Sequence, residues 1–338
     1  MKIKLLIATA DGDYANHLST ILSEKYAETF EVSVCSSAER LKNLLAVNKY
    51  DAALLEYDFA CDFASDINLS SISPPLVMID ETGVIADDNN SFKRIRKYQR
   101  VSAIAGNLLE NYAEIGKGVC NFDTSRARIT AVWSPSGGSG KTTVALAYAA
   151  QRIAKGNQAV YFNLENFSSA PAYFQESGKS ISKVFEKLES NVQLLLLGIR
   201  QQDAGSGILY FCGPENYDDI NILTSDDIET LVDACATDID ELVIDLSSQC
   251  DERTQKVFEI ANIILIVCDP SITTHAKLRQ FISQSNAFGR IQTKTVLVNN
   301  KGAKTTEPGF NKIVPLPFVN SADPISVYKS LSSGRFDW

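Results

Sequence analysis

The chain has 338 residues, which exceeds the size of a typical single hydrophobic core and predicts two domains. Apolar residues make up 45% and charged residues 22%, as in a soluble globular protein, and no apolar run approaches the ~20 residues that span a bilayer. Both halves share the net charge of −9, with 13 basic against 18 acidic residues in 1–127 and 19 against 23 in 128–338, so neither has the basic excess of a non-specific DNA binder.

The first third of the chain alternates short apolar strands with amphipathic helices. This alternation predicts an α/β domain over residues 1–115 with a five-stranded parallel, flavodoxin-like sheet. The apolar start of the chain is too short for a signal peptide and is interpreted as a first strand. Seven scattered cysteines, never spaced as Cys-x-x-Cys and mostly in apolar runs, favour a reducing cytoplasm. The expected strands are Ile3–Ala8, Phe30–Val34, Ala52–Leu55, Leu76–Ile79 and one near Phe92–Tyr98, and the expected helices are Ala15–Lys25, Ala38–Asn48 and Val101–Ala113.

Acidic residues follow the first and third of these strands. Asp11 and Asp13 come after the first strand, and Glu56 ends the third. This order resembles a response-regulator receiver domain, in which metal-binding acids and a phosphoacceptor aspartate occupy these places. Glutamate at position 56 lengthens the carboxylate and is not expected to be phosphorylated, so the resemblance implies an atypical receiver domain kept for contacts. Asp58 is an alternative acceptor, but it lies two residues further along.

A basic cluster and a break in periodicity close this domain. We interpret the basic cluster as a solvated strand edge, with an acidic partner or lipid headgroups as the alternative. Residues 116–127 are rich in glycine and polar residues and are expected to form a linker. The second domain is therefore predicted over residues 128–338. The basic cluster consists of Lys93, Arg94, Arg96, Lys97 and Arg100.

The second domain again alternates strands and helices. Its strands are apolar throughout, which argues for burial on both faces. The pattern predicts a parallel sheet wrapped by helices, with a glycine-rich loop after the first strand. The expected strands lie near 129–134, 159–163, 207–211, 241–245, 262–268, 294–299 and 313–315, and the helices near 141–154, 180–188, 225–236, 252–260, 272–284 and 324–331.

The glycine-rich loop has the spacing of a phosphate-binding loop. Gly137, Gly138 and Gly140 let the backbone curl with its N–H groups inward, and the following helix adds its positive N-terminal end. Lys141 can then reach the β- and γ-phosphates of a nucleotide, and Thr142 can ligate Mg²⁺. A plain glycine-rich turn is the alternative, but it gives no reason for lysine and threonine after the last glycine.

The stretch Ser-Gly-Gly-Ser-Gly-Lys-Thr-Thr resembles the deviant phosphate loop Lys-Gly-Gly-x-Gly-Lys-Thr of the MinD/ParA family of ATPases. Ser136 stands where that family has a signature lysine, which reaches across an ATP-bridged dimer to the partner's phosphates. Since serine carries no charge, we expect ATP to be bound with Mg²⁺ and hydrolysed slowly. The resemblance implies nucleotide contacts from Ser136, Gly137, Gly138, Ser139, Gly140, Lys141, Thr142 and Thr143.

Two further strand ends supply carboxylates. Asp245 resembles the Walker B aspartate, which contacts Mg²⁺ opposite Thr142, whereas a helix cap is the alternative role. Asn163 and Glu165 match the family's Asp-x-Asp, whose second aspartate positions the attacking water. Glu165 keeps a carboxylate that can orient water, although its extra methylene displaces the charge by about a bond length. The expected catalytic residues are Lys141, Glu165 and Asp245.

An asparagine pair follows the strand near 294–299. The resemblance implies that Asn299 hydrogen-bonds the adenine of the nucleotide. Asn300 is the competing candidate, and a plain turn would need neither side chain. The resemblance also extends to the segment 267–274 and covers essentially all of residues 128–320.

A receiver-like domain without its phosphoacceptor, placed ahead of a MinD-type ATPase, resembles the TadZ/CpaE family. Members of this family position the Tad (Flp-type) pilus assembly machine in bacterial cells. The resemblance implies an ATP-dependent homodimer in the cytoplasm, recruited to a pole or to the inner face of the membrane by pilus-assembly or polar-localisation proteins. No specific nucleic acid is expected as a partner, and membrane association is expected to be indirect or weak.

Three other functions stay open. A DNA-partitioning ATPase would need a local basic surface, which the net charge of the second half argues against. A MinD-like membrane-cycling regulator would need a basic amphipathic C-terminal helix, but Asp337 opposes the only two cations there, Lys329 and Arg335. Tyr328 and Leu331 instead favour a helix that packs on the core. A phosphate-loop kinase or transferase would need an acceptor site, and none is obvious.

Overall fold

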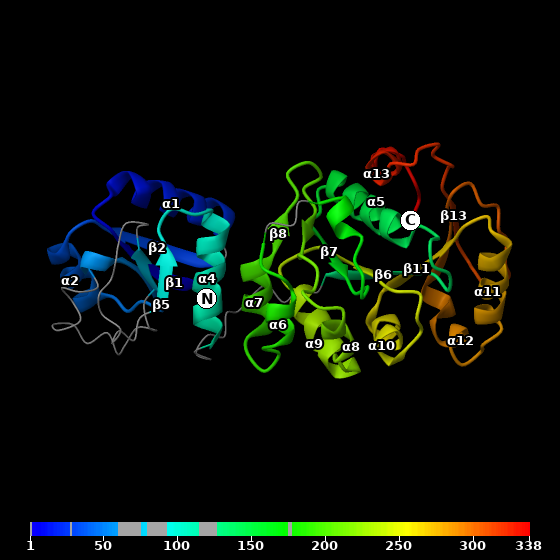
Figure 1. Cartoon of the computed structure of the whole chain (residues 1–338), viewed down its shortest axis with the longest axis horizontal. Helices are drawn as coiled ribbons and strands as arrows, with labels where there is room; N and C mark the ends of the chain where they lie inside the picture. Colours follow the sequence, from blue (N-terminus) through cyan, green and yellow to red (C-terminus); the bar gives the residue numbers. More distant parts are fainter. Residues whose placement is uncertain (1, 28, 60–75, 80–92, 115–126, 175–177) are drawn as a thin grey trace. The chain divides into compact units, whose positions relative to one another are not determined.

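The chain folds into two compact units in a computed structural model (Figure 1). One unit contains residues 1–122 with 189–198, and the other contains 123–188 with 199–338. The sequence-based division counted residues 189–198 with the second domain. None of the helices in the described part of the chain is both long and apolar enough to cross a bilayer. The structure describes residues 2–27, 29–59, 76–79, 93–114, 127–174 and 178–338.

The first unit contains a five-stranded sheet in the order β2-β1-β3-β4-β5, with every neighbouring pair parallel. This confirms the predicted parallel sheet, and the order is that of flavodoxin-like doubly wound folds. Its strands are β1 (Ile3–Ala8), β2 (Phe30–Cys35), β3 (Ala52–Glu56), β4 (Leu76–Ile79) and β5 (Lys93–Arg96). Its helices include α1 (Gly12–Lys25), α2 (Ala38–Val47) and α4 (Val101–Glu114).

Helix α7 (Val192–Ile199) belongs to the first unit through Gly198, although it comes from the middle of the sequence. Leu194 and Leu196 on this helix are buried. A Cβ atom on Gly106 of α4 would come within 2.3 Å of the Gly198 carbonyl oxygen, so a side chain there would collide with α7. Glycine therefore permits the close approach of α4 and α7.

The second unit is built on an eight-stranded sheet in the order β13-β12-β11-β6-β10-β7-β9-β8. All neighbouring pairs are parallel except β8 with β9, as the apolar strands predicted for most of the sheet. The strands are β6 (Arg128–Trp133), β7 (Ala159–Asn163), β8 (Gln201–Gln202), β9 (Leu209–Tyr210), β10 (Glu241–Asp245), β11 (Ile263–Cys268), β12 (Thr295–Asn299) and β13 (Ile313–Pro315).

Helices cover both faces of this sheet, with α5 and α13 on one face and α9 and α10 on the other (Figure 1). Tyr328 and Leu331 of α13 are buried in the core, and the indole N–H of Trp338 donates to Gln151 of α5 at 2.6 Å. The predicted core-packing role of this C-terminal helix is thus confirmed. The helices are α5 (Lys141–Ala154), α6 (Ser182–Phe185), α8 (Asp218–Asn221), α9 (Ser225–Cys235), α10 (Glu252–Ile260), α11 (Ile272–Ile282), α12 (Phe288–Ile291) and α13 (Pro324–Ser332).

The order of the strands decides which side chains meet. Strand β10 lies between β6 and β7, and its last residue, Asp245, is in register with Val132 of β6 and Asn163 of β7. Because the three strands are parallel, the segments that follow them leave the sheet at the same edge. That edge is where doubly wound folds place their ligands.

Candidate functional site

The glycine-rich loop joins β6 to α5 at this edge of the sheet. Gly140 is the N-cap of α5 and has a φ of +94°, in the left-handed region that glycine adopts without strain. The next two residues, Lys141 and Thr142, are buried in the first turn of the helix. The hydroxyl of Ser139 is also buried and has no partner within the protein. The loop therefore presents polar groups and a helix N-terminus at one place.

Lys141 brings together the segments that follow β7 and β10. Its ammonium group donates to the hydroxyl of Ser248 at 3.2 Å and lies 3.4 Å from a carboxylate oxygen of Glu165. The lysine predicted to contact phosphates and the glutamate predicted to orient water are thus neighbours. In this arrangement the charge of Glu165 is directed at Lys141.

Asp245 is completely buried at the end of β10. Tyr161 of β7 donates its hydroxyl to one carboxylate oxygen of Asp245 at 2.8 Å, whereas the other oxygen has no partner within the protein. Burial and the nearby charge of Glu165 raise the pKa of Asp245, although Thr142, Tyr161 and Lys141 oppose this rise. A divalent cation beside the unpartnered oxygen would stabilise the carboxylate, and the Thr142 hydroxyl is the kind of ligand that Mg²⁺ accepts.

Asn163 fixes the turn that carries Glu165. Its amide nitrogen donates to the Tyr161 hydroxyl at 2.9 Å and to Ser168 at 3.1 Å, and its amide oxygen accepts the backbone N–H of Glu165 at 2.7 Å. The Asn163 N–H directs the Tyr161 proton toward Asp245. Sequence analysis missed Tyr161, although alternation along a strand places it on the same face as Asn163.

The two asparagines at the end of β12 make different contacts. Asn299 donates to the backbone carbonyl of Thr305 at 2.9 Å, and its own amide oxygen is buried without a partner. Asn300 donates instead to the backbone carbonyl of Ser139, in the phosphate loop, at 2.9 Å. Of the two candidates for the adenine contact, Asn299 is the one with a buried acceptor still available.

The unpartnered atoms match the chemistry of a nucleotide with Mg²⁺. The Ser139 hydroxyl can donate to a phosphate oxygen, the second oxygen of Asp245 can face a cation or its water, and the Asn299 oxygen can accept an amine proton from a base. Other unpartnered buried atoms, such as the amide nitrogen of Gln193, lie elsewhere in the described part of the chain, but these three lie in the loop or at strand ends next to it. Since buried polar groups without a partner are rare in folded proteins, this grouping indicates a ligand. The donor set therefore fits ATP and Mg²⁺.

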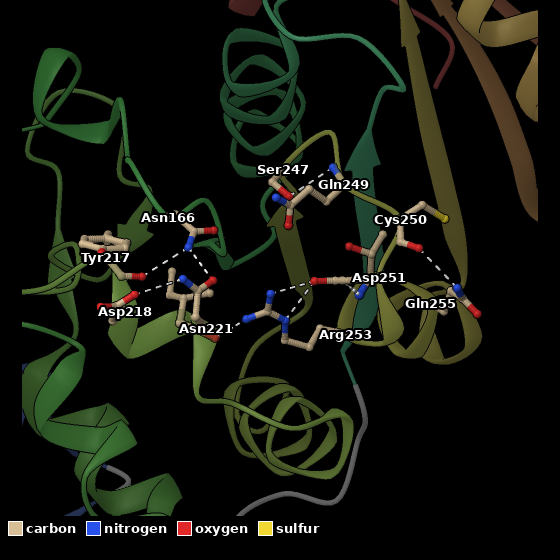
Figure 2. Close-up of polar contacts among 12 residues, drawn as sticks. Asn166, Tyr217, Asp218, Asn221, Ser247, Gln249, Cys250, Asp251, Arg253 and Gln255 are labelled. Carbon is tan, nitrogen blue, oxygen red and sulfur yellow. Dashed lines mark hydrogen bonds and ion pairs between the residues drawn. The ribbon is translucent and has the colours of Figure 1, made fainter.

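A cleft lies beside these segments, lined by the turn after β7, by α8 and by the segment after β10. Figure 2 shows Arg253 directed at Asp251, which it contacts at 2.7 Å, while Asn166 reaches toward Asn221 at 2.7 Å. Arg253 also donates to the backbone carbonyl of Ile220. These contacts tie the segments next to Glu165 and Asp245 to α8. The cleft is lined by Leu164, Asn166, Ile220, Ile228, Leu246, Ser247, Asp251, Arg253 and Thr254.

The first unit has its own cluster of a lysine and carboxylates, at the ends of β1, β3 and β5. The ammonium group of Lys97 lies 2.6 Å from one oxygen of Glu56 and 3.5 Å from Asp11. The other oxygen of Glu56 accepts the Thr9 hydroxyl at 2.9 Å and the Ala10 backbone N–H at 2.8 Å. Burial alone would raise the pKa of Glu56, but the hydrogen bonds from Lys97, Ala10 and Thr9 lower it.

The basic cluster of the first unit contains both buried and exposed side chains. Lys97 was grouped with an exposed basic cluster, and this was wrong, because Lys97 is only 3% exposed. Lys93, Arg94 and Arg96 are exposed as expected. Asp58, the alternative phosphoacceptor, is exposed two residues beyond the end of β3.

Comparison with solved structures identifies the fold. No protein-family model matches the chain, and no curated protein matches it. The structure is similar to a ParA family ATPase from Chlorobium tepidum TLS, with a TM-score of 0.52, 16% identity, and coverage of 62% of this chain and 93% of that one. At this identity the likeness shows the fold alone, an α/β fold like that of the ParA family ATPase, over the part of the chain that is covered.

Two weaker likenesses are to an ATPase and to a synthase. The cell division ATPase MinD from Pyrococcus furiosus has a TM-score of 0.46 and 12% identity, with coverage of 61% of this chain and 97% of that one. Cobyrinic acid a,c-diamide synthase from Mycobacterium smegmatis, solved with bound ADP and magnesium, has a TM-score of 0.43 and 13% identity, with coverage of 61% and 93%.

Proposed function

We propose that the second unit binds ATP with Mg²⁺ and acts as a slow, nucleotide-dependent switch. The observation that carries this proposal is the set of unpartnered buried atoms around the loop, on Ser139, Asp245 and Asn299. Lys141 would contact the phosphates, and Thr142 and Asp245 would hold Mg²⁺. The metal supplies charge neutralisation at the phosphates when it is bound.

Hydrolysis is proposed to be slow for two reasons. Ser136 places a small neutral hydroxyl where the MinD/ParA family has its signature lysine, so that source of positive charge is missing. Glu165, which would orient the attacking water, is paired with Lys141. Water activation requires Glu165 to release that contact once Lys141 engages phosphate. The chain thus retains more of the residues that bind ATP than of the residues that hydrolyse it.

The biological role we propose is that of a dimeric localisation or assembly factor for a Tad/Flp-type pilus system. The order of the two units supports it: a five-stranded flavodoxin-like sheet comes before the phosphate-loop fold, and Glu56 stands at the end of β3 in place of an acceptor aspartate. Because Lys97, Thr9 and Ala10 already engage both oxygens of Glu56, the first unit is suited to protein contacts rather than phosphoryl transfer.

The oligomeric state in different nucleotides tests this proposal. We expect the purified chain to be a monomer without nucleotide and with ADP, and a dimer with Mg²⁺ and a non-hydrolysable ATP analogue, as measured by light scattering after size exclusion. Lys141→Ala should stay monomeric throughout. A dimer that is indifferent to nucleotide would contradict the switch.

The same samples distinguish the proposed role from that of a DNA-partitioning ATPase. ATP-dependent binding to random-sequence DNA that weakens steeply with salt would favour a partition ATPase over the pilus role. ATP-dependent pelleting with liposomes would favour a membrane-cycling regulator, although the packed α13 argues against that outcome.

A further inference from the structure

The turn after β12 contacts the phosphate loop at two successive backbone carbonyl groups. Asn300 donates to the carbonyl of Ser139 at 2.9 Å, and the Lys301 ammonium group donates to that of Gly138 at 2.6 Å. Asn300 is only 4% exposed, and its amide nitrogen lies 2.3 Å from where a Cβ on Gly140 would be. Asn300 is therefore a fixed anchor between the turn and the loop.

The backbone of Lys301 is held in an uncommon conformation. Its φ is +53°, in the left-handed region that lysine rarely adopts. Hydrogen bonds on either side maintain this conformation: the Asn300 N–H donates to Cys268 at 2.8 Å, and the Gly302 N–H donates to Leu316 at 3.2 Å. Such conformations carry a cost, and they persist where the surroundings impose them, often at functional sites. Here the conformation brings an exposed ammonium group to the phosphate loop.

The charges around the loop leave a role for that ammonium group. The positive charge of Lys141 is paired with Glu165, and Asp245 adds a second carboxylate beside them. Ser136 contributes no charge, and a bound triphosphate would bring several further negative charges to the loop. Asp269 also lies near Lys301: burial would raise the pKa of Asp269, but hydrogen bonds from Ser271 and Thr274 and the charge of Lys301 lower it.

We propose that Lys301 adds positive charge to the binding of the ATP phosphates at this loop, where Ser136 contributes none. This inference rests on the proposed ATP binding, and it assigns part of the phosphate recognition to a residue outside the loop motif. Because the Lys301 ammonium group hydrogen-bonds the Gly138 carbonyl, a phosphate held by the same loop would lie within the ~8 Å over which charges interact at physiological ionic strength. Lys301 therefore attracts the phosphates of ATP, while Asn300 keeps the turn in place.

Four variants of the full-length chain separate the charge of Lys301 from its hydrogen bond to Gly138. Lys301→Gln keeps a donor and removes the charge, Lys301→Arg keeps both, and Lys301→Ala removes both. Lys304→Gln removes an equally exposed lysine three residues away. Calorimetry with Mg²⁺ would measure the affinity of each variant for ATP, ADP and adenosine.

We expect Lys301→Gln and Lys301→Ala to bind ATP about fivefold more weakly, because an exposed charge pair contributes up to ~1 kcal/mol, which is about fivefold in affinity. ADP should be affected less and adenosine not at all, and the loss should shrink at high salt. Lys301→Arg and Lys304→Gln should match the wild type.

Two results would overturn the proposal. If Lys301→Gln binds ATP as the wild type does, the charge of Lys301 has no role in binding. If adenosine binding falls together with ATP binding, Lys301 only supports the fold of the site. If the wild-type chain binds no ATP, the proposed function itself fails, which is a different result from a wild-type protein that binds ATP independently of Lys301.

Discussion

The two units each place a lysine between two carboxylates at the carboxyl edge of a parallel sheet, yet the two clusters differ in how completely their polar atoms are used. In the first unit, Lys97 and two neighbouring donors satisfy both oxygens of Glu56. In the second unit, Lys141 leaves one oxygen of Asp245 unpartnered, and the Ser139 hydroxyl has no partner either. A satisfied cluster holds a fold together, whereas an unsatisfied one indicates a ligand.

The largest expected effect comes from restoring a charge to the unsatisfied cluster. Ser136→Lys should raise the rate of ATP hydrolysis, by up to ~10³-fold, because a cation supplied to the phosphates in the transition state is worth that much in related phosphoryl transfers. Single-turnover hydrolysis at a protein concentration that supports dimers measures it. Ser136→Ala is the matched control and should leave the rate unchanged. An unchanged rate in Ser136→Lys would show that the missing lysine does not limit hydrolysis.

Breaking the satisfied cluster should affect stability instead. Lys97→Met leaves Glu56 without its buried partner and should destabilise the first unit by about 3 kcal/mol. Both tryptophans, Trp133 and Trp338, lie in the second unit, so their fluorescence follows that unit alone. The loss of stability should therefore shift the urea transition followed by circular dichroism and leave the transition followed by tryptophan fluorescence unchanged. Equal shifts in both transitions would contradict the separation of the two units.

Tyr161→Phe probes how Asp245 is held within the second cluster. Removal of the hydroxyl leaves a second oxygen of Asp245 unpartnered, and we expect the Mg²⁺ concentration needed for ATP binding to rise roughly tenfold, because such a loss costs about 1–3 kcal/mol. Tyr148→Phe is the matched control, since its buried hydroxyl accepts from Thr130 and donates to the carboxylate of Glu241, not to Asp245. If both variants have the same Mg²⁺ dependence, Tyr161 has no role in positioning Asp245.

The smallest expected effect concerns the stability of the first unit at acidic pH. The pKa of Glu56 is lowered in the folded chain, so its ion pair stabilises the first unit above the ordinary pKa of 4.5, and this contribution is lost as the pH falls through the lowered value. Glu56→Gln should therefore flatten the loss of stability of the first unit below about pH 4.5. Urea unfolding followed by circular dichroism over that range measures it. A variant as acid-sensitive as the wild type would assign the effect to other carboxyl groups.

Local patterns in the sequence account for the parts of the molecule that depend on neighbouring residues. Gly-Lys-Thr-Thr at a strand-to-helix turn predicted the loop and α5, and apolar runs predicted most strands of both sheets. The strand β8 was not predicted, because Gln201–Gln202 has no apolar residue. The burial of Lys97 could not be predicted, because it lies in a basic run and only the pairing of β5 with β4 brings it to Glu56. The contact of Lys301 with Gly138 depends likewise on the fold, since 163 residues separate the two positions.

The contrast between the clusters is tested most directly by calorimetric titration of the full-length chain with ATP and Mg²⁺. We predict that the wild type and Lys97→Met bind ATP equally well, and that Lys141→Ala binds it about 100-fold more weakly, since a charge-assisted hydrogen bond contributes about 1.5–3 kcal/mol. Undiminished binding by Lys141→Ala, or binding that is lost in Lys97→Met while the second unit stays folded, would contradict a nucleotide site at the loop of the second unit.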